Sequence, residues 1–227
     1  MQLPNATTQC FADAQQLAAA ATEWIIEQAN AALTARGVFR LVLAGGTTPA
    51  AIYRQLGALD QDWRGWQFYF GDERCLPVAD PERNSQLAAT TWFEPAGIDH
   101  RQIVAIPAEC GPVEAARRYA QLIQTALPFD LVLLGMGEDG HTASLFPDGC
   151  AFTEQQLTLA VTNAPKPPPQ RVSLTPTALA ASRQRLLLVT GESKRRALHA
   201  WQQGVALPIA EVAKHGSLNV FVDQVAT

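Results

Sequence analysis

A histidine framed by glycines follows an unbroken apolar run. Residues 129–149 read F-D-L-V-L-L-G-M-G-E-D-G-H-T-A-S-L-F-P-D-G, with the apolar run at 131–134 and the histidine at position 141. The run has the length and composition of a strand buried on both faces. Glycines after such a strand let the backbone turn sharply and come close to a ligand. A simple turn is the alternative interpretation, so the chemistry of the polar residues decides between the two.

His141 and Asp139 could together activate a water molecule. A neutral imidazole near pH 7 can accept a proton from water, and a nearby carboxylate can orient the ring and stabilise the imidazolium that forms. His141 is the only one of the four histidines in a glycine-framed loop of this kind. We therefore predict His141 as a general base and Asp139 as its partner.

Three other loops also combine glycine with polar residues after a predicted strand. They are G-G-T-T at 45–48, G-D-E-R at 71–74 and T-G-E-S-K at 190–194. In an open sheet of parallel strands, the carboxyl ends of the strands meet at one edge, and ligands bind there. We therefore expect these loops and the loop of His141 to line one crevice.

The crevice is predicted to bind an anion. The first loop leads into a helix with Thr48 as its N-cap and Pro49 as its first residue, and the free N–H groups and dipole of a helix start favour phosphate. The predicted binding residues are Gly45, Gly46, Thr47, Thr48, Asp72, Arg74, Lys166, Arg171 and Lys194. For each cation, the alternative is a solvated surface charge.

Other chemistries fit the sequence less well. Gly135-x-Gly137-x-x-Gly140 matches a dinucleotide-binding pattern, but it lies late in the chain and is followed directly by His141. There is no G-x-S-x-G motif for a serine hydrolase and no cluster of metal-ligand residues. We expect no metal and no cofactor. Water activated by His141 is the simplest remaining chemistry.

Composition indicates one α/β domain spanning residues 1–227. Apolar residues make up 48% of the chain and charged residues 17%, with a net charge of −4, so neither a nucleic-acid partner nor a membrane surface is expected. No apolar run is long enough to cross a membrane. The four cysteines are far apart, which favours a reducing compartment. These features predict a cytoplasmic protein, either a monomer or a small homo-oligomer.

Strands and helices are expected to alternate. Helices are predicted at 12–35, 48–56, 85–92, 113–127 and 195–202, and strands at 39–44, 66–70, 129–134, 157–162, 171–174, 185–189 and 217–223. Val113, Ala116, Ala120, Ile123 and Leu127 should share one face of the fourth helix. Alternation implies parallel pairing, hence a three-layer open sheet with helices on both faces.

The glycine-containing loops resemble those of the 6-phosphogluconolactonase family. The matching blocks stand in the family's order between about residues 40 and 195: G-G-T-T-P at 45–49, G-D-E-R at 71–74, G-M-G-E-D-G-H-T-A-S-L-F-P at 135–147, P-K-P-P-P-Q-R-V-S-L-T at 165–175 and G-E-S-K at 191–194. One departure is Asn84-Ser85, where many members read Ser-Asn.

This resemblance implies a Rossmann-like fold and a metal-free hydrolysis. The substrate would be 6-phospho-D-glucono-1,5-lactone and the product 6-phosphogluconate, in the oxidative pentose phosphate pathway. His141 would be the base and Asp139 its partner. Arg74, Arg171 and Lys194 would bind phosphate and sugar oxygens together with the 45–48 loop.

Two alternatives remain. Glucosamine-6-phosphate deaminases have a similar fold, but they carry a glutamate where this chain has Phe146, and an aromatic residue where it has Arg74. A non-catalytic sugar-phosphate sensor would keep the anion-binding loop without needing His141. The first alternative predicts release of ammonia, and the second predicts binding without hydrolysis.

Overall fold

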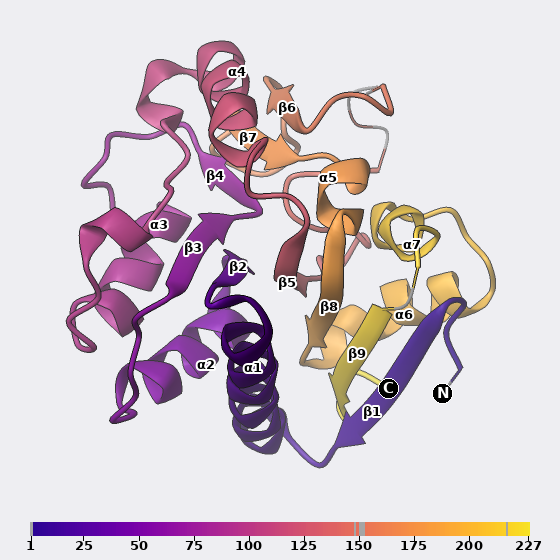
Figure 1. The fold of residues 1–227 in the computed structure, drawn as a ribbon. Helices are drawn as coiled ribbons and strands as arrows, with labels where there is room; N and C mark the ends of the chain where they lie inside the picture. Colours follow the sequence, from indigo (N-terminus) through magenta and orange to yellow (C-terminus); the bar gives the residue numbers. More distant parts are fainter. Residues whose placement is uncertain (1, 148, 150–152, 217) are drawn as a thin grey trace.

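Six parallel strands form the central sheet of the computed structural model, which describes residues 2–147, 149, 153–216 and 218–227. In spatial order they are β1 (Ala6–Phe11), β9 (Leu218–Asp223), β8 (Ser182–Val189), β5 (Phe129–Gly135), β2 (Phe39–Leu43) and β3 (Trp66–Phe70). Figure 1 shows helix α1 (Ala14–Arg36) crossing the front of this sheet and α6 (Arg195–Gln202) behind it. The predicted three-layer α/β fold with a mostly parallel sheet is confirmed.

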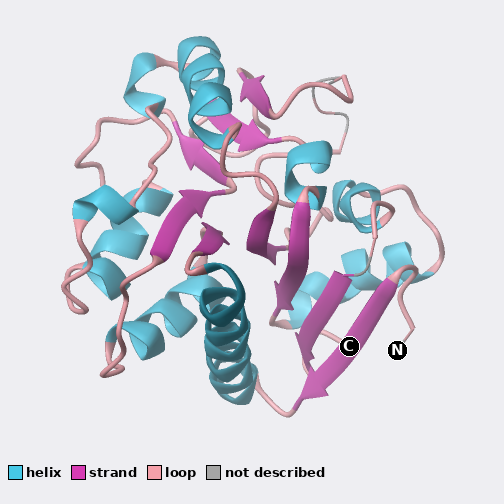
Figure 2. Cartoon of the chain, in the orientation of Figure 1, coloured by secondary structure: helices cyan, strands magenta, loops and turns pink. Residues whose placement is uncertain are grey.

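The other helices are short, and several are irregular. They are α2 (Thr47–Gly57), α3 (Asn84–Ala88), which continues as a π-helical turn (Ala89–Phe93), α4 (Pro112–Ile123), α5 (Pro176–Ala180) and α7 (Pro208–Ala213), with 3₁₀ turns at His100–Gln102, Ala108–Cys110 and Glu192–Lys194. Figure 2 shows these helices spread around the sheet and not stacked on one side. No helix among the described residues is long and apolar enough to span a membrane.

A second, antiparallel sheet covers one end of the first. Its strands are β4 (Asp72–Arg74), β7 (Arg171–Leu174) and β6 (Thr158–Val161), in that order. Only Gly71 separates β3 from β4, so the chain passes directly from the parallel sheet into the antiparallel one. The sequence pattern did not predict this small sheet, because strand β4 has only three residues and carries two acids and a base.

Most predicted strands lie within two residues of their observed limits, but three details of the sequence interpretation are wrong. Helix α2 is capped by Gly46 and not by Thr48, because Gly46 has φ 105°, a conformation that suits glycine. Helix α4 ends at Ile123 and not at Leu127. Val113, which was expected on the buried face, is 70% exposed, whereas Tyr119 of the same helix is fully buried. Strand β1 and the helices α5 and α7 were not predicted.

Three cysteines, Cys10, Cys75 and Cys110, are free thiols. The expectations for Cys150, and for residue 217 as the first of the last strand, lie outside the described residues.

Two buried tyrosines hold the ends of neighbouring strands. The hydroxyl of Tyr53 in α2 donates to the carbonyl of Ala44 (2.8 Å) and accepts from the N–H of the same residue (3.0 Å). The hydroxyl of Tyr119 in α4 does the same at Phe70, with distances of 2.9 and 2.8 Å. Ala44 follows β2 and Phe70 ends β3, so both contacts fix the backbone directly before a glycine loop.

Removing either hydroxyl should destabilise the fold. Tyr53→Phe or Tyr119→Phe leaves a backbone N–H and a carbonyl without that partner, at the half-buried Ala44 or at the buried Phe70, and such a loss typically costs about 1–3 kcal/mol. Urea denaturation should show this loss in the free energy of unfolding. Tyr69→Phe is the matched control, because its hydroxyl interacts with the side chains of Gln67 and Arg40 and not with a backbone group at a strand end. An equal or larger loss in the control would contradict the special role of the two strand ends.

Candidate active site

The loops that follow β2, β3, β5 and β8 meet around one crevice of about 370 Å³. This confirms the expectation that the glycine-containing loops share a site. Every predicted site residue except Asp139 lines the crevice. Asp139 instead lies behind the imidazole of His141.

His141 is held by Asp139 from the same loop. Asp139 Oδ1 lies 2.5 Å from His141 Nδ1 and also accepts the backbone N–H of His141 (3.2 Å). With Nδ1 engaged by a carboxylate, Nδ1 carries the proton and Nε2 is the basic nitrogen. The contact requires glycine at position 137, because a Cβ there would lie 2.0 Å from Nδ1 of His141.

The surroundings keep the imidazole neutral near pH 7. Burial is the largest cause that lowers the pKa of His141, and the charge of Lys166 acts in the same direction, whereas Asp139 and Asp72 raise it. Burial raises the pKa of Asp139, but its hydrogen bond and charge interaction with His141 outweigh burial and hold that pKa below its ordinary value. A neutral base beside an ionised carboxylate is the arrangement that proton abstraction from water needs.

The opposite wall offers donors to an anion. The first hydrogen bond of helix α2 runs from the Ala50 N–H to the Gly46 carbonyl (3.1 Å), which leaves the N–H groups of Thr47 and Thr48 without a helical partner. The Thr48 hydroxyl is hydrogen-bonded to Thr190 (2.6 Å), so the first and last of the four loops are tied together. A helix start of this kind favours phosphate.

Two arginines lie opposite each other across the small sheet. Arg74 of β4 is paired in register with Arg171 of β7, and like charges placed directly opposite normally destabilise a sheet. The Arg171 guanidinium donates to the backbone carbonyls of Lys166, Pro167 and Pro168 at 3.0–3.2 Å, so it anchors the proline-rich loop. Arg74 donates to the Glu82 carbonyl (2.6 Å) through Nη1, while its buried Nε has no hydrogen-bond partner in the described part of the chain.

The two lysines of the crevice differ in availability. Lys166 is paired with Glu138 at 3.0 Å. Lys194, at the end of a 3₁₀ turn, has no ion pair among the described residues, and burial lowers its pKa. An arriving anion therefore finds Lys194 uncommitted, whereas Lys166 would have to leave its partner.

Asp72 holds neighbouring segments together. Its Oδ2 accepts from the hydroxyl of the buried Ser144 (2.5 Å), and its Oδ1 accepts from Nδ2 of Asn84 (3.0 Å). Ser144 follows Ala143, which has a left-handed φ of 48°, a conformation that costs energy for a residue other than glycine. The bond to Asp72 thus helps to fix the strained turn that follows His141.

Sequence reasoning left several crevice-lining residues out of the predicted set, and three of them have polar or aromatic side chains that matter here. Asn84 and Phe146 were noted only as departures from family patterns, and Thr190 only as part of its loop, yet all three line the crevice. Asn84 lies directly against the backbone of Gly45, since a Cβ added to Gly45 would lie 2.0 Å from Asn84 Oδ1. That proximity cannot be read from sequence spacing.

Comparisons with known proteins find similar chains over nearly the whole length. The family model described as glucosamine-6-phosphate isomerases/6-phosphogluconolactonase matches residues 12–221. The 6-phosphogluconolactonase of Mycobacterium leprae is 33% identical over 95% of this chain and 93% of its own length, and that of Homo sapiens is 35% identical over 95% and 90%.

Solved structures show the same fold. The 6-phosphogluconolactonase of Thermotoga maritima superposes with a TM-score of 0.86 at 27% identity, covering 96% of this chain and 100% of that one. A monomeric glucosamine-6-phosphate deaminase superposes with a TM-score of 0.84 at 22% identity, covering 97% and 98% of the two chains, which establishes a common fold and no more.

The uncommitted lysine should contribute most to anion binding. Lys194→Ala should weaken the binding of inorganic phosphate about tenfold or more, because hydrogen bonds to charged groups contribute about 1.5–3 kcal/mol. Lys166→Ala is the matched control and should have a smaller effect, since Lys166 already has a carboxylate partner. Isothermal titration calorimetry measures both constants. Equal constants for Lys194→Ala and the parent protein would refute the assignment.

Proposed function

The chain belongs to the family of glucosamine-6-phosphate isomerases and 6-phosphogluconolactonases, and from this premise we propose that it hydrolyses 6-phospho-D-glucono-1,5-lactone to 6-phosphogluconate in the oxidative pentose phosphate pathway. One observation carries the proposal: a basic imidazole held by Asp139 lies in the same crevice as a helix start and cations suited to phosphate. The curated relatives, which are lactonases at 33–35% identity over nearly the whole chain, support it.

The reaction needs one activated water molecule. His141 Nε2 takes a proton from water while the water oxygen bonds to the lactone carbonyl carbon, and a tetrahedral oxyanion forms. Collapse of this intermediate breaks the bond between that carbon and the ring oxygen. The imidazolium returns the proton to the ring oxygen, which becomes a hydroxyl, and the product carboxylic acid ionises. Asp139 keeps Nδ1 protonated and stabilises the positive ring between the two transfers.

The remaining residues hold the substrate in place. Thr47, Thr48, Arg74 and Lys194 bind the phosphate together with the glycines of the 45–48 loop, and Arg171 and Lys166 bind sugar oxygens beside the proline-rich loop. Backbone N–H groups of the glycine loops stabilise the oxyanion. Binding energy from the phosphate holds the carbonyl in the geometry of attack. Asp72 holds Asn84 and Ser144 in place through its two carboxylate oxygens.

The deaminase and sensor alternatives lack supporting observations. A deaminase of this fold carries a glutamate at the position of Phe146, and here an apolar ring packs on His141 instead, with 4.7 Å between ring centres. A sensor would not need the contact between His141 and Asp139. We therefore retain the lactonase assignment.

We also propose how the enzyme operates in the cell. Residues 1–227 act as one domain, which the pairing of the first strand β1 with the last strand β9 supports. The enzyme works in the cytoplasm, as a monomer or small homo-oligomer, on a small phosphorylated substrate that cannot cross a membrane unaided. It uses no metal ion or cofactor and has no nucleic-acid partner.

Removing the base should abolish most of the catalysis. His141→Ala should lower turnover by about 10²–10⁴-fold, the usual contribution of general base catalysis, while inorganic phosphate binds as in the parent. The assay follows acid release from freshly made 6-phosphogluconolactone in the presence of a chelator, with the spontaneous rate subtracted. His199→Ala is the control, because His199 is exposed on α6. Unchanged turnover in His141→Ala would remove His141 from the mechanism, and ammonia release from glucosamine 6-phosphate would revive the deaminase.

The pH profile should report the neutral imidazole. Only unprotonated His141 can accept a proton, and burial lowers its pKa from the ordinary value of about 6.5. The value of kcat/KM should therefore stay high down to about pH 6.5 and fall at lower pH as a single proton is taken up. Initial rates measured across pH 5–8 test this. An acid limb with its midpoint above pH 7 would contradict the assignment.

A further inference from the structure

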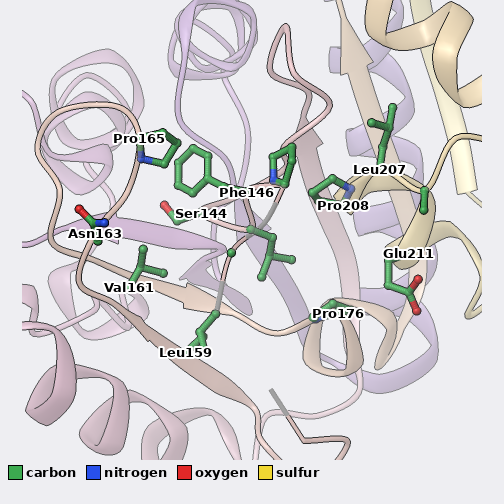
Figure 3. A pocket seen from close by; sticks show the side chains of 14 residues that line it. Ser144, Phe146, Leu159, Val161, Asn163, Pro165, Pro176, Leu207, Pro208 and Glu211 are labelled. Atoms are coloured by element: carbon green, nitrogen blue, oxygen red, sulfur yellow. The ribbon is translucent and has the colours of Figure 1, made fainter. Parts of the chain in front are cut away.

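A larger, more apolar cavity adjoins the crevice. It has a volume of about 740 Å³, and its lining includes Leu145, Leu159, Val161, Leu207 and Pro208. Figure 3 shows the ring of Phe146 at this cavity, between Pro165 on one side and Pro208 on the other. Among the described residues, Phe146 alone lines both the cavity and the crevice. Its ring is therefore the partition between the two spaces.

The same ring contacts both His141 and Arg171. The ring centres of Phe146 and His141 lie 4.7 Å apart, at an interplanar angle of 39°. The guanidinium carbon of Arg171 lies 5.7 Å from the centre of the Phe146 ring, within the range of a cation–π contact. Arg171 is in turn fixed by three carbonyls of the proline-rich loop. The orientation of the imidazole is thus set by Asp139 at one edge and by an anchored aromatic ring beside it.

We propose that Phe146 is a positioning residue for the reaction, separating His141 from the apolar cavity and holding its imidazole in place. This inference rests on the proposed function. Phe146 itself offers no proton and no charge, so it acts only through His141. Its place in the sequence is the one that a glutamate takes in deaminases, and a carboxylate there would put a second negative charge beside the base.

The partition limits which groups affect His141. Asp139 comes from its own loop, Asp72 from β4 and Lys166 from the proline-rich loop, and all three interact electrostatically with the imidazole. Arg171 of β7 contacts the Phe146 ring, and Glu211 of α7 lines the cavity beyond it. If the ring were removed, the cavity and the crevice would join, and water and the carboxylate of Glu211 would gain access to the imidazole. Burial is the main cause of the lowered pKa of His141, so the entry of water should be the main effect of removing the ring, and it should raise that pKa.

Histidine titration by NMR tests the partition without relying on turnover. In Phe146→Ala the pKa of His141 should rise towards its ordinary value of about 6.5. Turnover should fall at least tenfold with little change in KM, and phosphate affinity should stay within twofold. Phe146→Leu keeps an apolar side chain at the site, so the pKa of His141 should rise only slightly above its value in the parent. This variant replaces Phe146→Ala in the test if the alanine variant does not fold. The spectrum of His141→Gln assigns the resonance.

Leu145→Ala is the matched control. Leu145 is as buried as Phe146, at 7% exposure, and it lines the cavity without reaching the crevice. This variant should enlarge the cavity and leave the titration of His141 as in the parent. The proposal is overturned if Phe146→Ala and Phe146→Leu titrate like the parent, or if Leu145→Ala shifts His141 as far as Phe146→Ala does. Because the titration is read in the free protein, an absence of lactonase activity in the parent would count against the proposed function alone.

Discussion

The contact between Asp139 and Nδ1 of His141 constrains the whole loop that carries it. The two residues are separated only by Gly140, so the chain must turn tightly enough to bring a carboxylate back onto the ring two positions ahead. That turn needs a positive φ at Gly140 and no side chain at Gly137. Leu207 and the start of α7 pack beneath Gly140, and the Ile209 N–H donates to its carbonyl (3.2 Å). The strained, polar loop is therefore supported by an apolar layer below it.

Electrostatics in this protein is organised locally. The chain as a whole is acidic, with 21 acids and 17 lysines and arginines, yet the crevice gathers Arg74, Lys166, Arg171 and Lys194. Such a cluster is tolerable because its members are restrained by different means: carbonyls, a glutamate or partial burial. An anion bound beside the two arginines of the small sheet would offset the repulsion between them. A substrate with a remote phosphate meets a positive site in a protein that repels anions at longer range.

Much of the fold could be predicted, because glycine loops after apolar runs identify the carboxyl ends of parallel strands. The strands at 66–70 and 171–174 were placed with their exact limits, and the four converging loops followed from topology.

Prediction failed where local propensity and tertiary contact compete. Thr48 has the right side chain for an N-cap, but its hydroxyl bonds to Thr190, and the cap position is taken by Gly46, whose positive φ of 105° suits glycine. Val113 fits an amphipathic pattern yet faces solvent, while Tyr119 is buried because its hydroxyl bonds to the end of β3. Phe146 was recognised as a difference from deaminases, but only coordinates reveal that its ring touches His141.

The close approach of Asn84 to Gly45 couples two positions that lie 39 residues apart in sequence. A methyl group at position 45 would overlap the Asn84 amide, whose own hydrogen bonds to Asp72 keep it from moving aside. The effect of a substitution at either position therefore depends on the residue at the other, which is epistasis with a steric origin. During divergence, alanine could enter at position 45 only after a smaller side chain had replaced the asparagine. The order of the two changes, and not only their identity, decides whether an evolving lineage keeps a working site.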